Sequence, residues 1–354
     1  MQRDLSEQKC PACGAPLRFD PASGKSVCDW CGKSYEIPST AEEPAEGEAQ
    51  AEGGSAPKPG ISEEICVYSC RSCGAEIVTD AVTASVTCPY CGNNIILTEK
   101  VTGGLRPDGI IPFKIDKKDL PAAVQNFYKD KMLLPKRFFS ESSIRDLCGV
   151  YVPFWLYDCT MSGSAYYEGY NDSAMRSGDY IITERKHYDL ERGVNMDFKD
   201  IPVDGSARLD DALMDSLEPF DMADMKPFRM SYLSGFFAER FDKDSDEVRQ
   251  RAEDRMLTST MRIVNASAGD GYMGVVPKDN DIKPSNLNAK YVLLPVYTFK
   301  VNYKGTDYSF AMNGQTGEVV GDVPTDKGRA LTRRWGTFAA VFAAIMLIIW
   351  FISC

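Results

Sequence analysis

The chain has 354 residues, 44% of them hydrophobic and 26% charged, which is a globular composition long enough for about two or three domains. Its net charge of −11 argues against a protein whose general surface coats nucleic-acid phosphates or anionic lipid. Twelve cysteines stand against one histidine, and because residues 1–7 show no signal-peptide pattern, we expect reduced thiolates rather than secreted disulfides.

Eight of the cysteines form four Cys-x-x-Cys pairs, each followed at once by glycine: Cys10/Cys13, Cys28/Cys31, Cys70/Cys73 and Cys88/Cys91. Both units read Cys-x2-Cys-x14-Cys-x2-Cys, within a residue of zinc-ribbon spacing. Two residues between sulfurs let one tight turn direct both thiolates at one ion, and the glycine can adopt the left-handed conformation that completes the turn. The spacing predicts two structural zinc ions, one in residues 1–37 and one in residues 63–100.

The first unit has room for a hairpin, since Leu17 and Phe19 alternate before a turn at residues 20–25 and Val27 follows it. Four thiolates fill a tetrahedral ion, which favours a structural over a catalytic zinc. A dithiol redox role is the alternative, but that chemistry uses one Cys-x-x-Cys at the start of a helix. Neither ribbon has the basic excess that nucleic-acid binding requires, so we expect protein contact or spacing.

Between the ribbons, residues 38–62 are rich in Ala, Glu, Gly and Pro and contain five glutamates and one lysine. Such a segment has almost nothing apolar to bury. We expect a disordered acidic linker that acts as a flexible spacer, with an acidic interaction tail as the alternative.

Residues 101–326 have the composition of an α+β domain, for which we expect a mainly antiparallel sheet. A helix with Leu120 and Val124 on one face follows the capping candidates Asp116 and Asp119. Residues 180–188 and 194–198 alternate like strands. A short helix is expected from the spacing of leucines in residues 209–217, and a longer one after a capping box in residues 244–247.

An aromatic repeat links residues 153–157 to residues 295–299, and both copies begin with proline. Aromatics two apart share one sheet face, so Trp155 with Tyr157 and Tyr297 with Phe299 are expected to build equivalent parts of the core. A ligand-stacking site is the alternative.

No catalytic constellation is visible. The single imidazole, His187, lies in an alternating polar stretch that is typical of an exposed strand face. Two Gly-Lys-Ser tripeptides, beginning at Gly24 and Gly32, lack the first glycine of a Walker A loop. We therefore expect a protein that is not an enzyme.

Residues 335–352 contain no charge over eighteen positions and would span about 27 Å as a helix, close to a ~30 Å hydrocarbon core. This pattern predicts a C-terminal transmembrane helix. Four basic residues lie between 327 and 334, so the positive-inside rule puts the preceding domains in the cytoplasm. The expected localisation is the cell membrane, single-pass.

Several motifs together resemble the TFIIB-type zinc-ribbon membrane proteins of Gram-positive bacteria: Cys10-Pro-Ala-Cys13-Gly, Cys88-Pro-Tyr-Cys91-Gly, residues 149–157, Glu218-Pro-Phe-Asp221, residues 232–235 and residues 313–317. The resemblance covers nearly the whole chain. Proteins of this kind are often labelled primosomal helicases, which the lack of a Walker A loop contradicts here. Some are encoded with flotillin-like (SPFH) proteins and phage-shock protein A, so the resemblance implies these partners and a membrane-stress role.

We therefore expect a membrane-anchored zinc-ribbon adaptor that recruits protein partners at the cytoplasmic membrane face. The alternative is a nucleic-acid-binding accessory protein of replication or transcription.

Overall fold

The structure, a computed structural model, describes residues 10–37 and 106–324 apart from short gaps between 130 and 146, the backbone of four strands between 66 and 96, and scattered residues from 326 to 346. A small antiparallel sheet opens the described chain, with its strands in chain order. These strands are β1 (Arg18–Asp20), β2 (Lys25–Val27) and β3 (Ser34–Tyr35). Strands β1 and β2 form the hairpin that the sequence predicts.

A second, larger sheet dominates the molecule, and a separate two-stranded sheet pairs β4 (Cys66–Ser69) with β5 (Glu76–Thr79). Within the described chain the large sheet has eleven strands. They are β6 (Thr83–Thr87), β7 (Asn94–Ile96), β8 (Gly109–Ile110), β9 (Ile144–Ser177), β10 (Tyr180–Asp204), β11 (Lys226–Pro227), β12 (Phe237–Glu239), β13 (Gly274–Asn280), β14 (Lys283–Tyr303), β15 (Thr306–Asn313) and β16 (Val319–Gly321).

The large sheet is mainly antiparallel. Its central path runs β11-β8-β14-β9-β12-β6-β7, while β10 and β13 both pair with β9 and β15 joins β14 to β16. Two of the pairs are parallel, β12 with β9 and β14 with β8. Because β6 pairs with β12, part of the segment predicted as the second ribbon belongs to the same sheet as the α+β domain.

The helices are η1 (Lys117–Asp119), α2 (Leu120–Lys129), α3 (Asp211–Asp215), η3 (Met222–Asp224), η4 (Met230–Leu233) and α4 (Ser245–Ala268). Four of these, η1, α3, η3 and α4, begin where the sequence provides a capping carboxylate. Asp116, Asp210 and Asp244 each accept a hydrogen bond from a backbone N–H of the first turn of η1, α3 and α4. The helix starts expected near residues 116 and 244 are thereby confirmed.

Strand β9 is buried on both faces where it crosses the sheet. Odd-numbered side chains enter the larger core, which α2 and α4 cover, and even-numbered ones enter a second core, which α3 covers. Strand β14 lies beside this stretch and adds its own aromatics to the larger core. The prediction that the aromatic repeat builds core is confirmed, because its four members are at most 4% exposed: Trp155, Tyr157, Tyr297 and Phe299.

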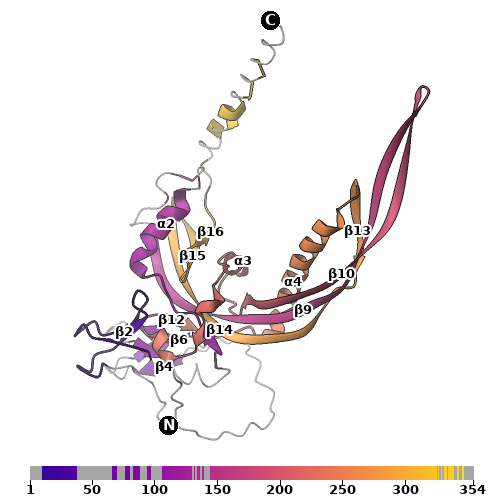
Figure 1. The fold of residues 1–354 in the computed structure, drawn as a ribbon. Coiled ribbons are helices and arrows are strands. Elements are labelled where there is room, and N and C mark those ends of the chain that lie inside the picture. The colour runs from indigo at the N-terminus through magenta and orange to yellow at the C-terminus, as the bar shows by residue number, and fades with distance from the viewer. Residues whose placement is uncertain are drawn as a thin grey trace.

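Strands β9 and β10 continue beyond the core as one long hairpin, which projects from the body as an arm (Figure 1). Their ladder is regular from Ser177 opposite Tyr180 to Cys159 opposite Phe198, and Gly178 and Asp179 form the turn. The two strand-like stretches that the sequence indicates in residues 180–188 and 194–198 are therefore parts of a single 25-residue strand.

The ribbon sheet is attached to the large sheet through Phe19. This side chain is 1% exposed and belongs to the larger core rather than to the small cluster of the ribbon. Its ring lies 5.4 Å from Tyr232 in an edge-on contact, and its backbone N–H donates to the carbonyl of Ser234 at 2.9 Å. The first ribbon is thus fixed to η4.

The expected C-terminal transmembrane helix is not found. Among the residues that the structure describes, no helix is long and apolar enough to cross a membrane. The predicted fold class was wrong in including this helix, and the single-pass membrane localisation derived from it was wrong too.

Removing the Phe19 ring tests the attachment of the ribbon. We expect Phe19→Ala to lower the free energy of unfolding by about 3–5 kcal/mol, because it leaves a cavity among the aromatic rings of the core. Trp30→Ala is the matched control, since Trp30 lies in the same ribbon and is 86% exposed, so its loss should cost less than about 0.5 kcal/mol. Urea titration followed by circular dichroism measures both, and equal effects would contradict the attachment.

Candidate metal centre

Two equivalent turns hold the first four cysteines. In the first, the N–H of Gly14 donates to the carbonyl of Cys10 at 2.8 Å, and in the second the N–H of Gly32 donates to the carbonyl of Cys28 at 2.9 Å. Both glycines are left-handed, with φ of 72° and 69°. A side chain at either position would be strained, which explains why glycine follows each Cys-x-x-Cys pair.

The turns bring four sulfur atoms together. The Sγ atoms of Cys10, Cys13, Cys28 and Cys31 all lie within 4.8 Å of one another. Two of these separations are 3.6 Å, Cys10 to Cys31, and 3.5 Å, Cys13 to Cys28. A tetrahedral ion with metal–sulfur bonds of about 2.3 Å would separate its ligands by about 3.8 Å. The four cysteines can therefore hold one metal ion.

The electrostatics of the four thiols also favour a cation between them. A hydrogen bond with the Tyr35 hydroxyl, 3.3 Å away, lowers the pKa of Cys10 to about 6, although desolvation opposes this, and the same bond raises the pKa of Tyr35 to about 12. A backbone hydrogen bond at Ala15 favours ionised Cys13, but desolvation and the neighbouring thiols raise its pKa to about 12. Four adjacent thiols ionise together only when a cation compensates their charge.

The sequence therefore located the first cysteine cluster correctly, and the structure brings together the four side chains that could hold a metal ion. The other four predicted ligands, Cys70, Cys73, Cys88 and Cys91, lie outside the described residues, so the second centre stays a prediction. Tyr35 was not anticipated. Only its position, four residues after Cys31, could have indicated that its hydroxyl returns to the metal-binding turn.

The charged side chains of the first ribbon largely neutralise one another. Residues 10–37 contain three basic and three acidic residues. Arg18 contacts Asp29 at 3.2 Å and Lys25 contacts Glu36 at 3.1 Å, so two of the three cations already have partners. The ribbon offers no basic patch among these residues.

His187 lies far along the chain from this centre, on the arm. Its Nδ1 is 2.6 Å from a carboxylate oxygen of Glu168, which lies diagonally across the hairpin on β9, and the side chain is 56% exposed. This is the polar strand face that the sequence indicates.

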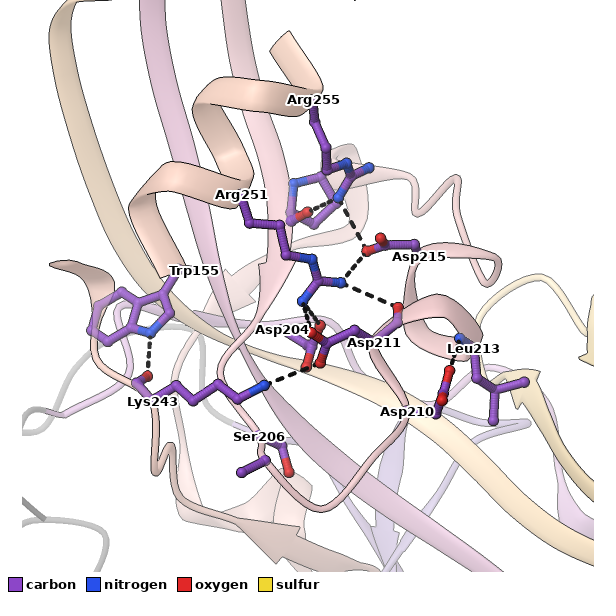
Figure 2. A network of polar contacts seen from close by, with 12 residues as sticks. Trp155, Asp204, Ser206, Asp210, Asp211, Leu213, Asp215, Lys243, Arg251 and Arg255 are labelled. Carbon is purple, nitrogen blue, oxygen red and sulfur yellow. Dashed lines mark hydrogen bonds and ion pairs between the residues drawn. The ribbon is translucent and has the colours of Figure 1, made fainter. Parts of the chain in front are cut away.

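A second group of ionisable side chains surrounds two arginines of α4 (Figure 2). Arg251 contacts Asp204 at 2.7 Å and Asp215 at 2.6 Å, while Arg255 binds both carboxylate oxygens of Glu218. Burial raises the pKa of Asp204, whose Oδ2 has no hydrogen-bond partner among the described residues. The arginines already occupy the space between the acids, so this cluster joins α4 to the end of β10 and to α3 rather than forming a metal site.

An open depression of about 1030 Å³ lies between α2, α3 and β16. Three polar groups on its wall make contacts that serve the fold. Asp210 caps α3, the Ser216 hydroxyl donates to the carbonyl of Ala212, and Asp307 accepts from Asn302. These contacts indicate a structural surface.

Comparison with known proteins adds one relative. A protein of Bacillus subtilis (strain 168) with the name "Uncharacterized protein YdjG" is 34% identical over 345 residues, which cover 96% of this chain and 96% of the relative. No family model and no solved structure matches the sequence.

The left-handed glycines give a test of the metal-binding turns. Gly14→Ala should weaken metal binding roughly tenfold, because an L-residue in this conformation costs about 1–2 kcal/mol. Gly193→Ala is the control, since a Cβ there meets nothing within 4 Å. Competition with a chromogenic chelator measures both affinities. Equal affinity of the two variants would show that the turn geometry does not matter.

The half-buried arginines of α4 give a second test, on stability. Arg251→Ala should lower the free energy of unfolding by about 3–5 kcal/mol, because it leaves the fully buried Asp204 without its partner. Arg249→Ala, on the exposed side of the same helix, removes only an ion pair with Glu253 and should cost about 0.3–0.5 kcal/mol. Urea denaturation separates the two. A small effect of Arg251→Ala would mean that the cluster contributes little.

Proposed function

The chain belongs to the family of YdjG of Bacillus subtilis, and we propose that it is a non-enzymatic adaptor in which a zinc-stabilised ribbon presents a protein-binding surface from a β-sheet scaffold. The cysteine centre supports this proposal. Four sulfur ligands at tetrahedral separations suit Zn²⁺ and leave no open position for water or substrate. The identical spacing around Cys70 and Cys88 extends the proposal to a second zinc ion.

Trp30 is the observation that carries the adaptor role. It lies between the metal-binding residues Cys28 and Cys31 and is 86% exposed. A large apolar ring fixed at a rigid turn but not buried is well suited to enter a pocket of a partner, and tryptophan is enriched among the residues that dominate binding energy. The zinc ion would fix the direction in which the ring points.

The attachment of the ribbon to the large sheet suits a protein that recruits partners. The contact of Phe19 with the large sheet fixes the ribbon to the body. A partner bound to the ribbon would therefore be held close to the rest of the protein, which raises its effective concentration for a second contact there. The resemblance to TFIIB-type zinc-ribbon proteins makes flotillin-like (SPFH) proteins and phage-shock protein A the partners that we propose.

Nucleic-acid binding is less well supported. A ribbon that docks on phosphates needs free cations, whereas Arg18 and Lys25 are paired with acids here. The four thiolates with one Zn²⁺ add a further formal charge of about −2.

Metal content tests the zinc proposal. We expect two zinc ions per chain in protein purified without chelator, falling to one in the variant that combines Cys10→Ser and Cys13→Ser, because a thiolate pair is lost from one site. Cys148→Ser should keep both ions, since Cys148 lies outside the cysteine cluster. Mass spectrometry of the intact protein counts the ions, and metal-free wild type would contradict the proposal.

Binding to purified partners tests the adaptor role. Trp30→Ala should weaken binding to phage-shock protein A or to a flotillin-like protein roughly thirtyfold, as expected for a residue worth about 2 kcal/mol. Lys33→Ala, in the same ribbon, should bind as wild type does, and both variants should keep their zinc. Binding by Trp30→Ala and by the Cys10→Ser, Cys13→Ser variant at wild-type strength would rule out the ribbon as the contact surface.

A further inference from the structure

The outer edge of the arm has a property that the adaptor role does not explain. Among the residues that the structure describes, β10 pairs with β9 alone. Strand β13 covers the other side of β9 only as far as Tyr170, so the tip of the arm extends beyond both β13 and α4 (Figure 1). Four apolar side chains near the tip are at least 51% exposed: Met175, Tyr180, Ile181 and Ile182.

The edge of β10 is also unusually regular. From Tyr180 to Phe198 the strand has no proline, and the first irregularity of its ladder lies between Phe198 and Ile201. Long open edges normally carry prolines, bulges or covering loops, because their unpaired backbone groups attract another strand. An edge of this kind is suited to pairing.

The geometry of the hairpin determines which backbone N–H and C=O groups of β10 can bond to another strand. Ser177 and Tyr180 flank a two-residue turn and so form a hydrogen-bonded pair. Even-numbered residues of β10 therefore direct their N–H and C=O groups at β9, while odd-numbered residues direct theirs outward. A second strand can bond to residues 181–195 without disturbing the hairpin.

We propose that this edge pairs with the same edge of a second copy of the chain, antiparallel, with the two-fold axis at Tyr188. In that register Glu184 faces Arg192 and Arg185 faces Glu191 of the second copy, and each pair occurs twice by symmetry. His187 faces Asp189. Opposite residues are both odd-numbered or both even-numbered, so the outward backbone groups meet each other.

Charge selects this register over its neighbours. A shift of two residues in one direction would place Lys186 opposite Arg192 and Asp189 opposite itself. A shift in the other direction would place Ile182 opposite Arg192 and leave Glu184 facing Leu190. Like charges directly opposite are unfavourable, which disfavours the first shift. The second shift keeps a single kind of complementary pair, Arg185 with Asp189, whereas the register centred on Tyr188 has two, Glu184 with Arg192 and Arg185 with Glu191.

The same register places two of the exposed apolar side chains, Tyr180 and Ile182, opposite apolar partners. Ile182 would lie opposite Val194 of the second copy, and Tyr180 opposite Met196. Val194 is buried against the larger core, on the face of the sheet that α4 covers, so Ile182 would extend that core across the interface. The turn at Gly178 would end opposite Phe198, where the bulge interrupts the edge.

Charge-swap variants of the full chain test the proposal, because Glu184 is exposed and forms no ion pair with the described residues, while Arg192 is half-buried and donates a hydrogen bond to the backbone carbonyl of Glu191. Sedimentation velocity of wild type at micromolar concentration should show a dimer. E184R alone and R192E alone should each raise the dissociation constant roughly tenfold or more, since each places like charges opposite one another at two symmetric positions.

Two combinations should restore dimers. The double variant E184R/R192E re-forms both pairs, and a mixture of the two single variants should form a mixed dimer although neither variant dimerises well alone. Lys199→Glu, beyond the paired stretch, should leave the dimer unchanged. A monomeric wild type, as expected if the edge receives a strand of another protein, would overturn the proposal, and so would a dimer that is insensitive to the single charge changes or is not restored by the combinations.

Discussion

The burial of Phe19 in the core of the large sheet is the contact on which the arrangement of the molecule depends. A cysteine ribbon of this size has little core of its own, and here its apolar cluster consists of Cys10, Leu17 and Cys28 with two partly buried neighbours. A metal ion bound by the four cysteines would hold the turns, while Phe19 holds the ribbon against Tyr232 and Phe236. Without that ring the ribbon would be a separate module on a chain, and the direction of Trp30 would be undefined.

The large sheet connects this attachment to the arm. Strand β9 pairs with β12 next to η4 and then continues through the double-faced core into the hairpin with β10. The ribbon and the tip of the arm consequently lie at opposite ends of the body (Figure 1). This separation would give the proposed adaptor two independent surfaces, the ribbon for a partner and the strand edge for a second copy, and pairing of two chains would double the number of ribbons available for binding.

Features set by neighbouring residues could be predicted from the sequence, and features set by distant ones could not. Cysteine spacing located the first metal centre, and Asp116 and Asp244 marked helix starts, because each depends on a few adjacent residues. The docking of Phe19 and the continuity of β10 depend on partners far away in the chain, which a local period does not reveal. The transmembrane prediction rested on hydropathy over residues 335–352, which reports composition, and among the described residues no helix is long and apolar enough to cross a membrane.

Hydrogen exchange before and after removal of the metal tests most directly whether the centre and the sheet are joined through Phe19. The amide of Phe19 donates to the carbonyl of Ser234, so its protection reports the attachment itself. We expect a chelator to accelerate exchange at Phe19 and in residues 230–238, while residues 150–157 of β9, buried on both faces, keep their protection. Unchanged exchange at Phe19 in metal-free protein would contradict the dependence of the attachment on the metal centre.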